Sequence, residues 1–424
     1  MMRILWLNAS LLLPLDKGGR LRTWHLMRHL ARRHTITYLS FADPQQPPAD
    51  RDGMSEVCAE LVTVPRTEQT KSGLQFYASV AKHLFDPVPY AVAQYRSRAY
   101  RAAIDRALTH ATYDRIVCDF LVPAINLPRQ LPAPSVLFTH NVEAEIWRRH
   151  AETEGGRLKK PLFRSQWLRM RRFEARTLAR FDRILAVSDV DRDTLQALYP
   201  ASMAGKSISV VPTGVDTAFF ADVPAEPISP RRLVFIGSMD WLPNVDAVTH
   251  FAREILPRIR AAEPNVTFSI VGRAPTPAVQ QLAELPGVEV TGRVDDIRPY
   301  LASAAVNVVP LRIGGGTRLK IYEAMAAGRA TVSTRIGAEG LPTEHGRHLL
   351  LADDAAAFAD AVVALLRNAD ERRTLASNAR ALVTSRYDWS IAATHLEQAI
   401  LDTTTPTPAA SPGTVTPITD AQTL

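Results

Sequence analysis

The residues best suited to chemistry gather in one stretch, residues 314–328, where three glycines precede a helical pattern. Such glycines let the backbone approach a ligand closely, and the first N–H groups of a helix bind anions. Arg318 and Lys320 place two positive charges in the first turn, where a helix by itself favours acidic residues. Glu323, one turn further on, is suited to accept hydrogen bonds from a vicinal diol such as a ribose. The stretch therefore predicts a site for a diphosphate attached to a ribose.

The same stretch also has a purely structural interpretation. Glycine-rich turns between strands and helices are common in α/β proteins, and Lys320 and Glu323 are spaced like an ordinary surface ion pair of a helix. The sequence has no phosphate-loop lysine motif. The residues alone leave both interpretations open.

Two further loops carry candidate residues. Gly18 and Gly19 follow the first predicted strand, where a glycine-rich turn lets backbone amides meet a phosphate, although a plain turn would have the same composition. His140 follows the predicted strand 135–139 and has Asn141 and Glu143 beside it. A single histidine at a strand end is usually structural, but these neighbours favour a functional role.

No metal site is expected. Asp189, Asp191 and Asp193 alternate like metal ligands, but Ser188 before them indicates an N-capped helix with acidic residues in its first turn. Cys58 and Cys118 have no metal-ligand spacing and cannot form a disulfide framework. The cysteine content is typical of a reducing cytoplasm, so we expect a cytoplasmic protein.

With 424 residues, 46% hydrophobic and 22% charged, the chain is globular and suggests two domains. The apolar start of the chain predicts a first strand and not a signal peptide. No apolar run reaches the roughly 18 residues of a membrane span.

The net charge of +7 is concentrated between residues 157 and 183, which hold ten Lys or Arg against two acidic residues. Apolar residues interleave with these cations, so the region predicts a basic amphipathic helix. It could rest on the anionic inner face of the cytoplasmic membrane, or it could be an arginine-rich solvated helix. Nucleic-acid binding is a poorer fit, because no recognised motif accompanies the charge.

Short apolar runs alternate with helical patterns, which predicts doubly wound parallel sheets. The expected strands are residues 3–8, 35–41, 61–64, 115–119, 135–139, 183–187, 207–212, 232–237, 266–272, 288–290, 305–311, 330–333 and 348–351. The expected helices are residues 21–33, 245–262, 276–285, 319–327, 355–368 and 370–385. A Pro-rich boundary lies at residues 224–230, and the Thr/Pro-rich end after residue 402 is expected to be disordered.

Several motifs occur in an order that resembles glycosyltransferase family 4, over about residues 2–402. Residues 210–216 (VVPTGVD) followed by Phe219 look like its interdomain linker, and residues 290–296 (VTGRVDD) are similar to its GxVxD strand and loop. The glycine loop followed by EAMA at residues 323–326 matches its donor-site signature. Residues 388–390 (DWS) resemble the start of its terminal helix. The wordings THNVE, SMDWLPN and GGGTRLK are similar to bacterial members linked to exopolysaccharide assembly.

The resemblance implies a GT-B fold, in which two Rossmann-like doubly wound domains face a cleft and a C-terminal helix crosses back. Residues 1–212 would form the acceptor-side domain and 213–388 the nucleotide-sugar domain. Residues 389–402 would form the returning helix, with 403–424 as the tail. The implied activity is metal-independent transfer, with retention, of a sugar from a UDP-sugar or GDP-sugar to a polysaccharide or lipid-linked acceptor.

The resemblance also implies roles for single residues. The catalytic residues would be His140 and Glu323, and Glu323 would also hold the ribose. The nucleoside would lie against Gly272, Arg293 and Val294. The donor diphosphate would be bound by Gly18, Gly19, Gly316, Thr317, Arg318, Leu319 and Lys320.

The sequence departs from the family at two places. Gly315 stands eight residues before Glu323, where the family has a second glutamate, and Glu339 is a hypothetical substitute. The basic pair that normally follows the first donor-domain strand is replaced by residues 238–241 (SMDW), so Arg318 and Lys320 are expected to compensate. A catalytically silent nucleotide-sugar-binding or scaffold protein of a polysaccharide system therefore stays open as the alternative. A sugar-nucleotide epimerase and a membrane-binding protein without chemistry are weaker alternatives.

Overall fold

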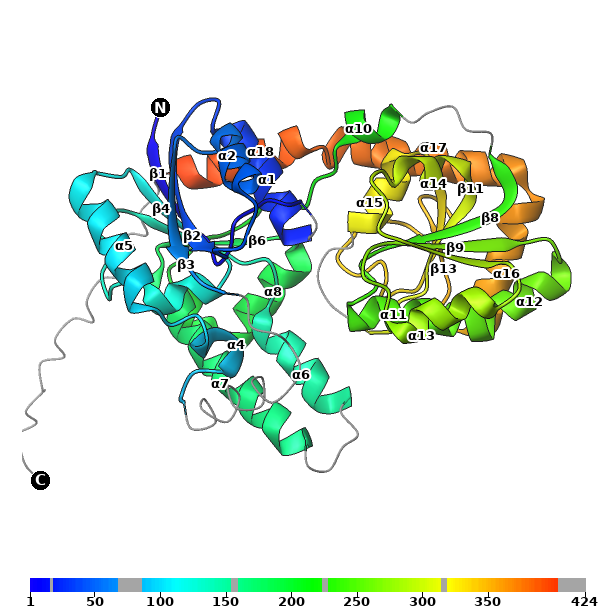
Figure 1. Cartoon of the computed structure of the whole chain (residues 1–424), viewed down its shortest axis with the longest axis horizontal. Coiled ribbons are helices and arrows are strands. Elements are labelled where there is room, and N and C mark those ends of the chain that lie inside the picture. Colours follow the sequence, from blue (N-terminus) through cyan, green and yellow to red (C-terminus); the bar gives the residue numbers. More distant parts are fainter. Residues whose placement is uncertain (16–17, 68–85, 154–158, 223–227, 314–318, 403–424) are drawn as a thin grey trace, which may run out of the picture.

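The computed structural model describes residues 1–402 except 16–17, 68–85, 154–158, 223–227 and 314–318. The chain forms two α/β domains, each with a parallel sheet between layers of helices (Figure 1). No described helix is both long enough and apolar enough to cross a membrane.

The first sheet has seven parallel strands in the order β3-β2-β1-β4-β5-β6-β7. Its strands are β1 Arg3–Leu7, β2 Thr35–Ala42, β3 Glu60–Pro65, β4 Arg115–Asp119, β5 Ser135–Phe138, β6 Arg183–Ala186 and β7 Ile208–Val210. All seven lie where the apolar runs predict them. Most are buried along their length, because helices cover both faces of a doubly wound sheet.

The second sheet has six parallel strands in the order β10-β9-β8-β11-β12-β13. Its strands are β8 Ser229–Ile236, β9 Thr267–Val271, β10 Val288–Gly292, β11 Ala304–Val309, β12 Ala330–Ser333 and β13 Leu350–Leu351. In each sheet the strand order reverses beside the first strand, at β1/β4 and at β8/β11. Doubly wound sheets bind ligands outside the carboxyl ends of the strands at such a switch point.

The helices of the first domain connect its strands over both faces of the sheet. They are α1 Gly18–Leu30, α2 Pro48–Gly53, η1 Met54–Glu56, α4 Tyr90–Ala93, α5 Arg98–His110, η2 Val122–Asn126, α6 Glu143–Thr153, α7 Lys159–Arg180, α8 Asp189–Leu198 and α9 Pro200–Met203. The Ser188 hydroxyl accepts a hydrogen bond from the Asp191 backbone N–H at 3.1 Å, which confirms the capped helix predicted for α8.

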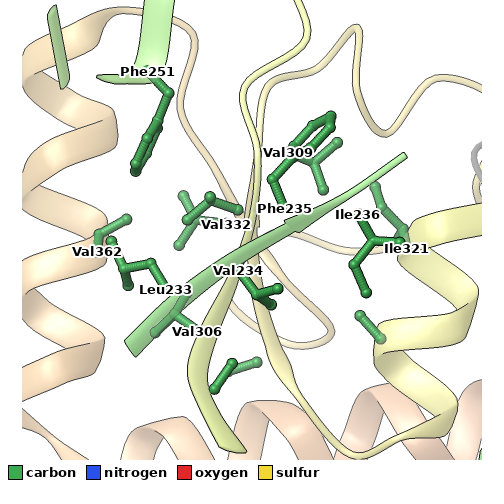
Figure 2. Packing of buried hydrophobic residues seen from close by; sticks show 14 of the residues in the cluster. Leu233, Val234, Phe235, Ile236, Phe251, Val306, Val309, Ile321, Val332 and Val362 are labelled. Carbon is green, nitrogen blue, oxygen red and sulfur yellow. The ribbon is translucent and has the colours of Figure 1, made fainter. Parts of the chain in front are cut away.

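The helices of the second domain and its connections are α10 Thr217–Ala221, α11 Leu242–His250, η3 Phe251–Ile255, α12 Leu256–Ala262, α13 Pro277–Gln280, η4 Gln281–Glu284, α14 Arg298–Ser303, α15 Leu319–Ala326, α16 Ala355–Arg367, α17 Ala369–Arg386 and α18 Trp389–Leu401. The helix predicted over residues 245–262 begins earlier, at Leu242, and contains a π-helical turn at η3. Buried apolar residues of β8, β11, β12, α15 and α16 form the core of this domain, and Figure 2 shows Phe235, Val309 and Ile321 among them.

The last helix, α18, returns to the first domain and lies beside α1 (Figure 1). Its Trp389, Leu396 and Ile400 belong to the first-domain core. Where the chain crosses back, the Val215 N–H donates to the Tyr387 carbonyl at 2.7 Å and the Trp389 N–H to the Val215 carbonyl at 3.2 Å. The returning helix of the GT-B expectation is therefore confirmed.

Candidate functional site

The carboxyl ends of both sheets open onto a cleft of about 1510 Å³ between the two domains. Among the residues that line it, the first domain contributes Gly18, Gly19, Arg22, Phe120, His140 and Asn141. The second domain contributes Gly237, Asn244, Arg273, Arg293, Lys320 and Glu323. The cleft therefore brings together candidates that are more than 300 positions apart in the sequence.

Lys320 places a cation on the second-domain wall. Its ammonium donates to the Asn244 Oδ1 at 2.7 Å and lies 4.0 Å from the centre of the Phe235 ring. A Cβ atom added to Gly237 would lie 2.9 Å from this ammonium, so the glycine after β8 leaves room for it. The Lys320 side chain thus brings its charge to the loop after β8, where the family's basic pair is missing.

Glu323 lies one turn along the same helix and lines the cleft with a partly exposed side chain. Burial raises the pKa of its carboxyl to about 7, and the nearby Lys320 charge acts in the opposite direction. A carboxylate that burial destabilises gains most when a ligand donates hydrogen bonds to it. Its position suits the predicted contact with a diol.

The two first-domain glycines, Gly18 and Gly19, have different neighbours. A Cβ atom added to Gly18 would lie 3.0 Å from the Leu319 Cδ1, so the start of α1 lies against the start of α15 across the cleft. A Cβ atom added to Gly19 would lie 2.6 Å from the Phe120 ring. Close packing therefore gives Gly19 a structural reason to lack a side chain, and contact of either glycine with a diphosphate stays a prediction.

His140 is buried in a hydrogen-bond network of the first domain. Its Nδ1 lies 3.0 Å from an Arg22 Nη atom, its Nε2 lies 2.6 Å from the Asp119 Oδ1, and its ring stacks on Phe120 with 3.7 Å between centres. Arg22 also donates to the Thr213 hydroxyl in the interdomain linker. Asp119 accepts three more hydrogen bonds at its other oxygen, from Trp6, Asn8 and Thr23.

This network fixes the tautomer of His140. A guanidinium only donates hydrogen bonds, so the His140 Nδ1 must accept from Arg22 and the proton must reside on Nε2, which donates to Asp119. Burial lowers the pKa of His140, although Asp119 acts in the opposite direction. The ring is therefore neutral at neutral pH, and both of its nitrogens are already bonded.

The predicted nucleoside residues lie at the carboxyl ends of β9 and β10. Arg293 is exposed and lines the cleft, while Val294 packs against the second-domain core. Gly272 has a φ of +155°, and a Cβ atom there would lie 1.8 Å from the Gly237 carbonyl oxygen. Only glycine fits this position, which lets the ends of β8 and β9 approach each other.

Part of the prediction lies outside the described residues. Gly316, Thr317 and Arg318 fall in the range 314–318, as does Gly315, so their placement is not described. Of the predicted diphosphate-binding residues, the structure places Gly18, Gly19, Leu319 and Lys320. Within the described part of the chain, no three His, Cys, Asp or Glu side chains are arranged to hold a metal ion.

Glu339, the hypothetical substitute for the missing family glutamate, is engaged in an ion pair with Arg149. Its carboxylate accepts two hydrogen bonds from the Arg149 guanidinium of α6, at 2.9 and 3.0 Å. The pair borders a separate pocket of about 80 Å³ beside Asn141 and Asp191. The hypothesis that Glu339 supplies a carboxylate to the donor sugar stays a prediction, and in this structure the group bridges the two domains through Arg149.

The basic region forms α7, which lies side by side with α6 and extends away from the first sheet (Figure 1). Its Trp167, Phe173 and Leu178 pack toward the first-domain core. The exposed side carries mainly cations, namely Lys160, Arg164, Arg171, Arg172, Arg176 and Arg180. Most of the apolar side of this helix therefore faces the protein, and Leu168 is an exposed exception.

Four residues at the site were not predicted from the sequence: Arg22, Asn244 and Arg273, which line the cleft, and Asp119, which is buried behind His140. A signal existed for two of them. Asp119 is a charged residue at the end of a buried predicted strand, and Arg22 is a charged residue among apolar positions of a helix. Asn244 ends the segment SMDWLPN, whose family resemblance assigns no role to this residue, and Arg273 carried no comparable signal.

Two family models match the chain. The model described as "Glycosyltransferase Family 4" matches residues 17–219, and the model described as "Glycosyl transferases group 1" matches residues 230–368. The two matches fall on the two sheet-containing halves of the chain.

Among curated relatives, the chain is 34% identical over 221 residues to a phosphatidyl-myo-inositol mannosyltransferase of Mycolicibacterium smegmatis. The match covers 49% of this chain and 54% of the relative, so the chain spans about half the length of that protein. It is 27% identical over 296 residues to a glycogen synthase of Mycobacterium tuberculosis, which is 67% of each chain.

Solved structures share the fold over nearly the whole chain. A sucrose-phosphate synthase from Thermosynechococcus elongatus covers 94% of this chain and 98% of its own, with a TM-score of 0.68 and 16% identity. Anabaena HepE in complex with UDP and glucose covers 94% and 99%, with a TM-score of 0.60 and 14% identity. At such low identity these likenesses concern the fold alone. Together with the family matches and the two-sheet architecture, they show that the chain belongs to the family 4-like glycosyltransferases with the GT-B fold.

Proposed function

We propose that this protein transfers a sugar from a nucleotide-diphosphate sugar to a glycan or lipid-linked acceptor, with retention of anomeric configuration and without a metal ion. The observation that carries the proposal is the position of Lys320. Its ammonium lies at the second-domain wall of the cleft, and the preceding residue, Leu319, lies against Gly18 at the start of α1. A protein cation and the N-termini of two helices are suited to neutralise a departing diphosphate.

The neutral His140 fits a mechanism without a side-chain base. The acceptor hydroxyl would attack the anomeric carbon on the face from which the diphosphate leaves. The new C–O bond forms as the bond to the phosphate oxygen breaks, and that oxygen takes the hydroxyl proton. Catalysis would then consist of alignment and charge stabilisation. His140 would align the donor sugar, and the bonds from Arg22 and to Asp119 hold its ring in place.

The relatives guide the choice of substrates. The Anabaena structures are complexes with UDP and with UDP-glucose, which supports a nucleotide-sugar donor, and UDP-sugars and GDP-sugars are both to be tested. The M. smegmatis relative is named for mannosyl transfer to phosphatidyl-myo-inositol, and a Klebsiella pneumoniae relative, 24% identical over 165 residues, is named for its place in a cps region. These names support a lipid-linked or polysaccharide acceptor in exopolysaccharide assembly.

The test is a screen of UDP-, GDP- and ADP-sugars against purified protein in the presence of EDTA. The bound donor should raise the melting temperature by mass action, and donor hydrolysis should follow. Replacing His140 with alanine should abolish hydrolysis, whereas His110→Ala, an exposed histidine on α5, should not. Donor binding without hydrolysis or transfer would favour the silent scaffold alternative. Activity that disappears with EDTA would contradict metal independence.

We also propose that the protein works in the cytoplasm at the inner face of the membrane, held there by the exposed cations of α7. Because most of the apolar side of α7 faces the protein, the attraction would be electrostatic, at about 1 kcal/mol for each cation near an anionic surface. The protein should float with anionic vesicles and dissociate from them as the salt concentration is raised. It should not bind neutral vesicles. Salt-resistant flotation, or binding that survives Arg171→Gln together with Arg172→Gln, would contradict this.

A further inference from the structure

The cleft is larger than a single donor requires. At about 1510 Å³ it exceeds the roughly 300–1,000 Å³ of ordinary small-molecule sites, so it has room for a second substrate. One end of it is lined by first-domain residues at the carboxyl ends of β2 and β3 and on α2. We refer to this end as the β2–β3 arm, and its lining includes Phe41, Asp43, Gln46, Asp50, Arg66 and Tyr95.

Arg66 supplies a positive charge to the β2–β3 arm. Its guanidinium carbon lies 3.7 Å from the centre of the Tyr95 ring and 5.4 Å from that of Phe41. Its hydrogen bonds, to the Gln94 carbonyl and Gln94 Oε1, are long at 3.5 and 3.4 Å. Over the residues that the structure describes, no carboxylate lies within ion-pair distance of Arg66.

This arrangement prepares the guanidinium for an oxyanion. Tyr95 covers one face of the planar group, which restricts its rotation, and Arg66 lines the cleft. A guanidinium held in this way can donate two parallel hydrogen bonds to a phosphate or a carboxylate.

The other side of the arm suits sugar hydroxyls. The Gln46 amide donates to the Leu13 carbonyl at 2.6 Å and to the Asp50 carboxylate at 3.1 Å, so both side chains are held in place. Carboxylate and amide oxygens accept hydrogen bonds from hydroxyl groups. The arm therefore combines acceptors for hydroxyls with one cation for an anion.

We propose that the β2–β3 arm is the acceptor subsite and that Arg66 binds a phosphate ester carried by the acceptor sugar, with Tyr95 as the platform that orients the guanidinium. The inference rests on the proposed function and adds the chemical class of its acceptor, a phosphate-bearing glycan. The phosphate could join the sugar to a lipid carrier or belong to a water-soluble sugar phosphate.

Three probes test this inference by calorimetry on protein saturated with the nucleoside diphosphate that the donor screen identifies. They are citronellyl phosphoglucose, its neutral counterpart citronellyl glucoside, and glucose 1-phosphate. The wild type should bind citronellyl phosphoglucose at least about tenfold more tightly than the glucoside. If glucose 1-phosphate binds as tightly as citronellyl phosphoglucose, the phosphate belongs to a soluble sugar phosphate. If it binds more weakly, the phosphate belongs to a lipid-linked acceptor.

Arg66→Gln should abolish the preference for phosphate and leave binding of the glucoside unchanged. Arg98→Gln, an exposed arginine of α5, makes the same charge change outside the cleft and should behave like the wild type. Tyr95→Leu should weaken phosphate binding without removing the charge. Donor-induced stabilisation should persist in every variant, which shows that each one folds and separates this test from that of the proposed function.

Several outcomes would overturn the inference while leaving the proposed function intact. They are equal binding of the charged and neutral probes by the wild type, no detectable binding of either phosphate-bearing probe, and an equal loss in Arg66→Gln and Arg98→Gln. A protein that binds no sugar nucleotide would instead overturn the proposed function.

Discussion

Replacing Lys320 with methionine should weaken donor binding while leaving the fold intact. Methionine keeps most of the apolar stem and removes the ammonium, which Asn244 holds beside the Phe235 ring. A hydrogen bond to a charged group stabilises a complex by about 1.5–3 kcal/mol. Losing it should raise the Kd of the nucleoside diphosphate by about 10- to 150-fold.

Ligand-induced stabilisation measures this change. At a ligand concentration of about 100 times the wild-type Kd, the wild type gains about 2.7 kcal/mol in free energy of unfolding. At the same concentration the variant should gain only about 0.3–1.4 kcal/mol. Denaturant unfolding with and without nucleoside diphosphate gives both values, and the ligand-free curves show any loss of intrinsic stability separately.

The matched control is Lys160→Met, which removes the same charge from the exposed side of α7, outside the residues that line the cleft. It should keep the full ligand-induced stabilisation. The reasoning is refuted if Lys320→Met retains about 2.7 kcal/mol as well, or if both variants lose the same amount, since the charge of Lys320 would then have no specific role.

Three further changes have defined outcomes. Gly272→Ala should lower the free energy of unfolding by about 3 kcal/mol or more, because the new Cβ would lie 1.8 Å from the Gly237 carbonyl oxygen. Urea unfolding measures this loss, and a loss below about 1 kcal/mol would contradict the expectation. Glu323 has a pKa raised to about 7, so its carboxylate is ionised above that pH and donor affinity should decline as pH falls through it. Calorimetry across this range should show the decline in the wild type and not in Glu323→Gln; a wild type indifferent to pH would argue against a ribose contact. Arg149→Met should cost only about 1 kcal/mol or less, because water reaches both members of the Arg149–Glu339 pair, and thermal unfolding that shows more than about 2 kcal/mol would disprove it.

The strands could be predicted from the sequence because their signal is local. β4 and β5, for example, are short apolar runs, which is the pattern of strands that helices cover on both sides. Because the strand β5 could be predicted, the position of His140 just after its end could be predicted as well. The same logic located the start of α15 and its charged residues.

The partners of these residues could not be predicted, because they come from distant parts of the chain. His140 meets Arg22 from 118 positions away, and Arg149 meets Glu339 from 190 positions away. The spacing of residues in the sequence does not indicate such pairs. The neutral tautomer of His140 and the ion pair of Glu339 with Arg149 are therefore known only from the structure. For α7, the periodicity indicated a basic and an apolar side but not that most of the apolar side faces the protein.

The return of α18 has a consequence for how the protein is made. Trp389, Leu396 and Ile400 are the last apolar residues that the first domain acquires, although its sheet ends near residue 210. On the ribosome, the surface of α1 that they cover stays exposed until the residues of α18, Trp389–Leu401, have emerged. The amino-terminal half is therefore completed last, and a nascent chain truncated before Trp389 would expose that surface to chaperones and to aggregation.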